Sequence, residues 1–204
     1  MRMRAMFGLA LGAAWLGGGG AGFAQERPAM QPTRDVTVTY QIEGEAAPGM
    51  AGQREMKIRY SAATHRMRVE SLDQRRHGFA IMDRAAQRMM MVLPERQAYM
   101  EMPLRPGAAP AMMEDTPSLR FARGGTETVA GLSCTQWQVS DAGNPAHRGT
   151  ACLTADGVLL HGEGGGARPG GVRAVKVEYG ALPAELFSPP VGFQKMEMPG
   201  LPRP

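Results

Sequence analysis

The stretch Val36-Thr37-Val38-Thr39-Tyr40-Gln41-Ile42 alternates apolar and polar side chains without interruption. Successive side chains of a β-strand point to opposite faces, so a period of two is typical of a half-buried strand. The apolar residues of this stretch therefore share one face, and the polar residues share the other. The pattern predicts a strand with a core on one side only.

Similar short strands recur along the chain, separated by turn-forming pairs such as Pro48-Gly49 and Asp156-Gly157. Because they follow one another closely, we expect hairpins whose neighbours in sequence are neighbours in the sheet. Roughly ten short strands and little helix predict a mainly β fold, either a closed barrel or a curved antiparallel sheet. Strands are expected at 56–60, 67–70, 79–83, 88–93, 97–102, 126–140, 149–153, 158–161 and 172–179.

Proline and glycine interrupt this rhythm in two places. The stretch Pro103 to Gly125 contains four prolines, and its part 108–119 is expected as a short helix or a loop, forming a flap on the sheet. The glycine-rich stretch 162–171 is expected as a flexible excursion. The single β domain should span 35–197, between a flexible segment at 25–34 and a disordered, proline-rich tail at 198–204.

The N-terminal residues have the features of a secretory signal peptide. Arg2 and Arg4 precede an apolar run from Ala5 to Leu16, and the small-residue motif Gly22-Phe23-Ala24 follows. A run of about twelve apolar residues is too short for a transmembrane helix, which needs ~20. We therefore expect cleavage after Ala24 and a periplasmic mature protein, without the cysteine at the cleavage site that a lipoprotein needs.

The charge of the mature chain indicates no nucleic-acid partner. The signal carries two arginines and no acids, so the formal charge falls from +4 to +2. The densest basic cluster comprises Arg66, Arg68, Arg75 and Arg76. A solvated strand face explains it better than contacts with phospholipid head groups, although a weak peripheral contact with an anionic membrane surface stays open. We expect a monomer.

Cys134 and Cys152 are the only cysteines. They flank two expected strands that join through the turn-rich stretch 141–145, so a disulfide across this hairpin is geometrically easy. A redox pair would more often be a close Cys-x-x-Cys, and a zinc site needs about four ligands. A structural disulfide is the favoured interpretation.

Methionine is abundant in the mature chain, mostly in the clusters 89–91, 100–102, 112–113 and 196–198. These methionines have three possible interpretations. The first is a binding surface, because unbranched, polarizable thioethers suit variable apolar ligands. The second is ordinary filling of the core, and the third is a cuprous-ion site, because Met-x-Met pairs can chelate that ion. The first interpretation predicts a cavity for an apolar ligand between sheet and flap. Its expected lining is Val38, Tyr40, Met56, Ile58, Met89, Met91, Met100, Met102 and Trp137.

Catalytic and metal sites are not indicated. His65, His77, His147 and His161 lie apart, without His-x-His or His-x-x-x-His spacing, so they are expected as solvated loop residues. A metal site would have to be assembled by folding alone. The serines lack a Gly-x-Ser-x-Gly frame, and neither cysteine should be a free thiolate. We expect neither cofactor nor enzyme activity.

Two stretches of the sequence resemble motifs of a known family. They are Thr128-Val129-Ala130-Gly131-Leu132-Ser133-Cys134 and Leu186-Phe187-Ser188-Pro189-Pro190-Val191-Gly192-Phe193. With the order of strands before them, they resemble secreted bacterial domains of unknown function in the LolA/LolB-like superfamily of lipoprotein-localisation factors. This resemblance implies an unclosed barrel around an apolar cavity that binds lipid or acyl chains. The alternative is an envelope structural or interaction module with a packed interior, which a cavity too small for an acyl chain would favour.

Overall fold

A computed structural model of the chain describes residues 26–44, 54–73, 78–104, 118–165 and 170–197. Within these ranges the chain forms one curved sheet of twelve strands and two short 3-10 helices, and none of the described helices is long and apolar enough to cross a membrane. The mainly β class predicted from the sequence is confirmed. The strands are β1 Val36–Gly44, β2 Glu55–Ser61, β3 Arg66–Ser71, β4 Phe79–Asp83, β5 Arg88–Leu93, β6 Ala98–Pro103, β7 Leu119–Val129, β8 Leu132–Asp141, β9 Asn144–Leu153, β10 Leu159–Gly165, β11 Gly170–Tyr179 and β12 Gln194–Met196, and the helices are η1 Pro94–Arg96 and η3 Ala184–Phe187.

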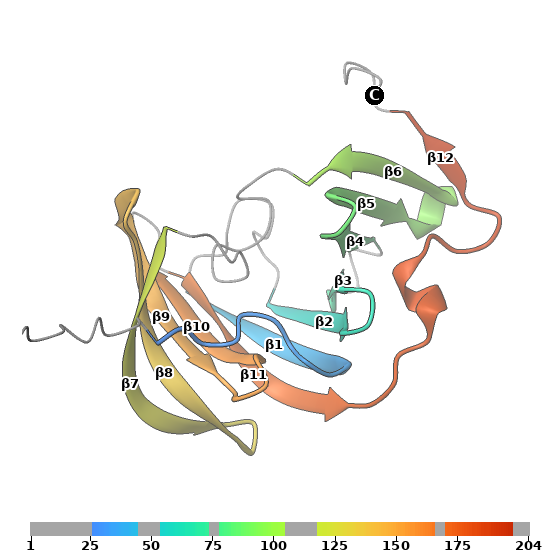
Figure 1. The fold of residues 1–204 in the computed structure, drawn as a ribbon. Helices are drawn as coiled ribbons and strands as arrows, with labels where there is room; N and C mark the ends of the chain where they lie inside the picture. The colour runs from blue at the N-terminus through green and yellow to red at the C-terminus, as the bar shows by residue number, and fades with distance from the viewer. Residues whose placement is uncertain (1–25, 45–53, 74–77, 105–117, 166–169, 198–204) are drawn as a thin grey trace, which may run out of the picture.

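The sheet consists of two meanders joined at β1. Its strand order is β12-β6-β5-β4-β3-β2-β1-β11-β10-β9-β8-β7, so the chain leaves one edge after β6 and starts again at the other edge with β7 (Figure 1). The expectation that sequence neighbours pair is correct inside each meander. It fails at β1 with β11 and at β12, which returns from the C-terminus to pair parallel with β6.

Three expectations about strand boundaries were wrong. The sheet has twelve described strands rather than about ten, since β12 was not expected and 126–140 divides into two strands at the Ala130-Gly131 turn, where both residues have positive φ. Strand β7 begins at Leu119 rather than at Thr126, and there Leu119 and Phe121 are buried while Arg120 between them is exposed. The glycines at 162–165 and 170–171 continue β10 and β11. Positions 108–117 of the expected flap, and the tail at 198–204, lie outside the described residues.

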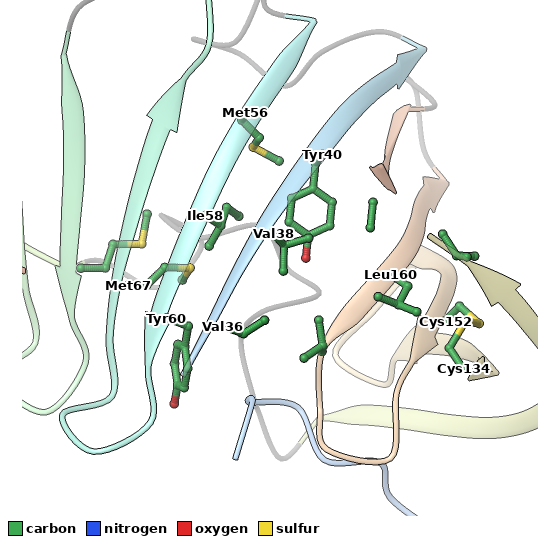
Figure 2. Close-up of a cluster of buried hydrophobic side chains, with 14 residues drawn as sticks. Val36, Val38, Tyr40, Met56, Ile58, Tyr60, Met67, Cys134, Cys152 and Leu160 are labelled. Atoms are coloured by element: carbon green, nitrogen blue, oxygen red, sulfur yellow. A yellow bond between two sulfur atoms is a disulfide. The ribbon is translucent and has the colours of Figure 1, made fainter. Parts of the chain in front are cut away.

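The largest apolar cluster lies where the two meanders meet. Val36, Val38 and Tyr40 of β1 are 2–3% exposed and point in the same direction as the buried side chains of β2. Figure 2 shows these side chains facing Leu160 of β10, with the disulfide beyond it. The Tyr40 hydroxyl donates to the Leu159 carbonyl at 2.6 Å, which satisfies the one polar atom that this buried ring carries.

A second cluster fills the β7–β10 end of the sheet. Trp137 packs edge-on against Phe121, with 6.3 Å between ring centroids. The segment 26–34 runs along this end and contributes Met30 to the cluster. It is held by a backbone hydrogen bond from Thr33 to Asp156 and an ion pair between Arg34 and Asp156.

The predicted disulfide is confirmed. Cys134 on β8 and Cys152 on β9 are bonded, with 5.3 Å between their Cα atoms, and both are 2% exposed. The bridge closes the β8–β9 hairpin across the turn that the sequence placed there. Closing a loop of this size contributes ~3 kcal/mol in the chain-entropy model.

A third cluster covers the other meander from outside. Phe187 in η3 is 2% exposed and packs against Phe79, Ile81 and Val92. Figure 1 shows the C-terminal segment, with its short helix, passing outside β3 and β4 before it reaches β12. Arg68 anchors this segment by donating from Nη1 to the Leu186 carbonyl at 3.1 Å.

Candidate functional site

Strand pairing collects the methionines on one face of β3–β6. We name the face that carries Val36, Val38 and Tyr40 on β1 the core face, and the one that carries Thr37 and Thr39 the opposite face. Residues paired directly across an antiparallel ladder point to the same side, so the register extends the core face from strand to strand. One row on it is Val36–Tyr60–Met67–Met82–Met89–Met102, and the next row is Val38–Ile58–Val69–Ala80–Met91–Met100, with Met196 beyond.

We call the part of the core face on β5 and β6 the methionine face. It consists of Met89, Met91, Met100 and Met102, all of which are partly buried. Met89 is paired with Met102, and Met91 with Met100, so the four thioethers form a compact group on two neighbouring strands. The candidates from the β1–β2 part of the predicted lining are different, because Val38, Tyr40, Met56 and Ile58 are 2–6% exposed and belong to the packed core. Trp137 lies in the separate cluster at the β7–β10 end.

The pocket beside β1 and β2 is small. It measures about 50 Å³ and lies between Met30, Val38, Tyr40 and Ile58. Sites for drug-sized ligands usually measure about 300–1,000 Å³, so an acyl chain does not fit inside this part of the core. A wider, open pocket of about 630 Å³ lies at the β7–β10 end, and its wall mixes Phe121 and Val139 with polar side chains.

Two of the four basic residues singled out in the sequence form ion pairs. Arg66 donates to the buried Asp83 carboxylate at 2.9 Å. The backbone N–H of Ala86 and the Arg66 guanidinium hold the pKa of Asp83 below its usual value. Arg68 lies on the same face as Arg66, the opposite face, where it pairs with Glu70 and lies over the Phe79 ring, 3.5 Å from its centroid. Both guanidiniums therefore have structural partners, while positions 75 and 76 lie outside the described residues.

The expectation of solvated loop histidines was wrong for His161. Its side chain is 18% exposed and lies in the middle of the sheet, on β10, among acidic residues. His65 is exposed in the β2–β3 turn, as expected, and its Nδ1 lies 2.9 Å from the Tyr60 hydroxyl. The side chains of His77 and His147 are not among those described. The partly buried His161 was missed because, apart from Glu163 on the same strand, its partners Glu43, Glu127 and Arg173 come from three other strands.

A family model matches residues 46–156, which is more than half of the chain. It describes a domain of unknown function, DUF4412. The chain belongs to this family. The predicted membership in a family of domains of unknown function is confirmed. A search of the curated proteins gives no match.

Solved structures share the fold at low sequence identity. An uncharacterized conserved protein from Thermus thermophilus is 15% identical, with a TM-score of 0.51 over 80% of this chain and 90% of its own. MucB is 16% identical, with a TM-score of 0.52 over 76% of this chain and 57% of MucB. LolA superfamily protein NE2245 from Nitrosomonas europaea is 12% identical, with a TM-score of 0.37 over 78% of this chain and 92% of its own. At these identities the likeness to the first two structures concerns the fold alone, and nothing is argued from the third, whose TM-score is below 0.5.

Proposed function

We propose that the mature chain is a periplasmic, non-enzymatic binding protein whose ligand is a lipid or another molecule with an acyl chain. The observation that carries this proposal is the methionine face. Four thioethers lie side by side on β5 and β6, partly buried and continuous with the apolar core. Thioether side chains adapt their rotamers to ligands of varying shape, which suits the binding of acyl chains.

The signal peptide predicted from the sequence supports the compartment, and the curvature of the sheet supports the mode of binding. An acyl chain on the methionine face would lie against the concave core rather than inside the 50 Å³ cavity, which is too small to admit it. Burying apolar area contributes about 25 cal/mol per Å², so a chain that covers the four methionines would gain several kcal/mol. No bond making or breaking is needed for this function.

Native mass spectrometry of the mature protein from periplasm tests the proposal directly. We expect a stoichiometric adduct that denaturing extraction releases as phospholipid or fatty acid. Met91→Asp should abolish the adduct while the sheet stays folded, because a carboxylate would be desolvated under the acyl chain. Val191 is fully exposed in the C-terminal segment, so Val191→Asp serves as the matched control and should keep the adduct. Full ligand retention in folded Met91→Asp would refute the proposal.

A protein-interaction module with a packed interior is the second candidate. The small volume of the pocket beside Val38, Tyr40 and Ile58, about 50 Å³, favours it, because closely packed side chains leave little room for a ligand there. MucB, which shares the fold, occurs in a solved complex with MucA. In this case the partner would bind an edge strand such as β7, which has a neighbour on one side only among the described strands. A clean apo mass, with binding instead to an envelope protein, would favour this candidate.

A further inference from the structure

A group of charged side chains around His161 lies apart from the methionine face. The imidazole Nε2 is 3.4 Å from a carboxylate oxygen of Glu163 and 3.7 Å from one of Glu43. The three ligand atoms lie within 4.8 Å of one another. Nε2 itself is fully buried and has no hydrogen-bond partner among the described residues, although a buried polar atom normally has one.

The backbone brings these residues together in a way that needs a glycine. His161 and Glu163 are two residues apart on β10, so their side chains share a face, while Glu43 comes from β1, two strands away. Gly171 of β11 is paired with both Glu43 and Glu163 and lies between them. A Cβ at this position would lie 2.5 Å from the Gly162 carbonyl oxygen and 3.3 Å from Glu163 Cγ. Because Gly171 has no side chain, the space over β11 stays open. The carboxylates of Glu43 and Glu163 approach each other in this space.

From this geometry we propose that Glu43, His161 and Glu163 form a binding site for a divalent transition-metal ion of the zinc type. Zinc binds imidazole nitrogen and carboxylate oxygen at about 2.0–2.2 Å, so two ligand atoms of a tetrahedral site are ~3.4 Å apart. The distance from Nε2 to Glu163 already has this value, and the distance to Glu43 is only a few tenths of an ångström longer. A divalent ion neutralises the two carboxylates, and a neutral imidazole supplies the third ligand.

The other imidazole nitrogen has its own partners. Arg173 Nη1 lies 3.2 Å from Nδ1, and a guanidinium has only donors, so this contact places the proton of a neutral ring on Nε2. A metal ion would displace that proton, and the ring would then carry its proton on Nδ1, which requires Arg173 Nη1 to move away from this nitrogen because both would be donors. Glu127 Oε2 is 3.8 Å from Nδ1, near enough to accept this proton after a small shift. The Glu127 carboxylate is held in place by hydrogen bonds that it accepts from Gln136 and Arg173.

Access to the site is provided by a neighbouring pocket of about 300 Å³. Its wall includes His161, Glu163 and Glu127, together with Cys152 of the disulfide. Water molecules in this pocket can complete the coordination of an ion held by three protein ligands. The site is therefore open toward this pocket on one side. On the other side, its three protein ligands are held by strands of the sheet.

Calorimetric titration of the mature, chelator-treated protein with zinc chloride tests the proposal. We expect one zinc ion per chain, at least 100-fold weaker binding in His161→Gln and at least 10-fold weaker binding in Glu43→Gln and Glu163→Gln. Glu127→Gln should lose about 10- to 100-fold, as for a partner of a ligating histidine. His65→Gln and Glu178→Gln are matched controls on exposed positions and should bind as the wild type does.

A second measurement separates metal binding from a purely structural role of His161. Nitrogen-15 NMR of the imidazole should show the proton moving from Nε2 to Nδ1 when zinc is added, and this change should be absent with magnesium. Met91→Asp should bind zinc unchanged, because β5 lies five strands from β11. Zinc binding by folded His161→Gln with wild-type affinity, or a wild-type protein that binds no zinc, would overturn the proposal.

Discussion

Strands β1 and β5 belong to the same sheet but bury opposite faces. In β1 the buried side chains are Val36, Val38 and Tyr40, which define the core face. In β5 the one fully buried side chain is Val92, which belongs to the opposite face, while the methionines of the core face stay partly exposed. Between them, β4 buries Ile81 on one side and Met82 on the other.

The reason for this switch lies outside the strands themselves. The core face of β1 packs against Leu160 of β10 and borders, across a small pocket, on the N-terminal segment, whereas the opposite face of β4–β6 is covered by η3 and the residues around it. Each strand therefore buries the face that a distant segment happens to cover. On the methionine face, by contrast, the four side chains are only partly buried, and Met89 packs against the edge of the main core cluster.

Phe187→Ala should have the largest effect on stability. This ring is 2% exposed and joins η3 to Phe79, Ile81 and Val92, so its removal leaves a cavity that costs about 3–5 kcal/mol. Met100→Ala on the methionine face is the comparison, and its cost should be about 1 kcal/mol or less, because the side chain is only partly buried. Urea unfolding measures both. Equal losses in the two variants would contradict the assignment of the buried face.

Replacing the disulfide should have the next largest effect, and it should act on the other half of the sheet. The double variant Cys134→Ser/Cys152→Ser is expected to lose about 3 kcal/mol of unfolding free energy. Hydrogen exchange should show the loss of protection concentrated in β8 and β9, with β4 and β5 changed less. A uniform loss over the whole sheet would mean that the two halves unfold as one unit.

Asp83→Asn should have a smaller, pH-dependent effect at the end of β4. Asp83 accepts hydrogen bonds from Arg66 and from the Ala86 backbone. Replacing its carboxylate by a neutral amide is expected to lower the free energy of unfolding by about 1–2 kcal/mol at neutral pH. Its pKa is lower in the folded state, so this contribution is present above the ordinary carboxyl pKa and is lost as the pH falls through the folded value. Unfolding at neutral pH and in strong acid should show the difference between variant and wild type disappear in acid.

Several features were predictable because they depend on local sequence. The alternation in 36–42 predicted β1, the Asp156-Gly157 pair predicted a tight turn before β10, and two cysteines across one hairpin predicted the disulfide. Met100 and Met102 are two residues apart on β6 and therefore share a face, as their register with β5 shows. These predictions succeed because a strand period of two is fixed by backbone geometry and needs no distant partner.

The candidate sites depended on distant pairings, which the sequence does not show. Trp137 was expected beside the methionines, but β8 lies near the other edge of the sheet from β5 and β6. The bulges in β7 and β10 shift the register, so parity could not be followed from one strand to the next. His161 is the clearest example, because its carboxylate neighbours include Glu43, which is far away in the sequence and is brought close by β11.

The sequence by itself determined most of the strands, the disulfide and the apolar character of one face of each strand. Only the tertiary structure decided which face each strand buries and which polar side chains meet. The physical reason is that alternation is a property of a few consecutive residues, while burial depends on the segment that covers a face. For β4–β6 that segment contains Phe187, and for Glu43 and Glu163 the decisive neighbour is the glycine between them.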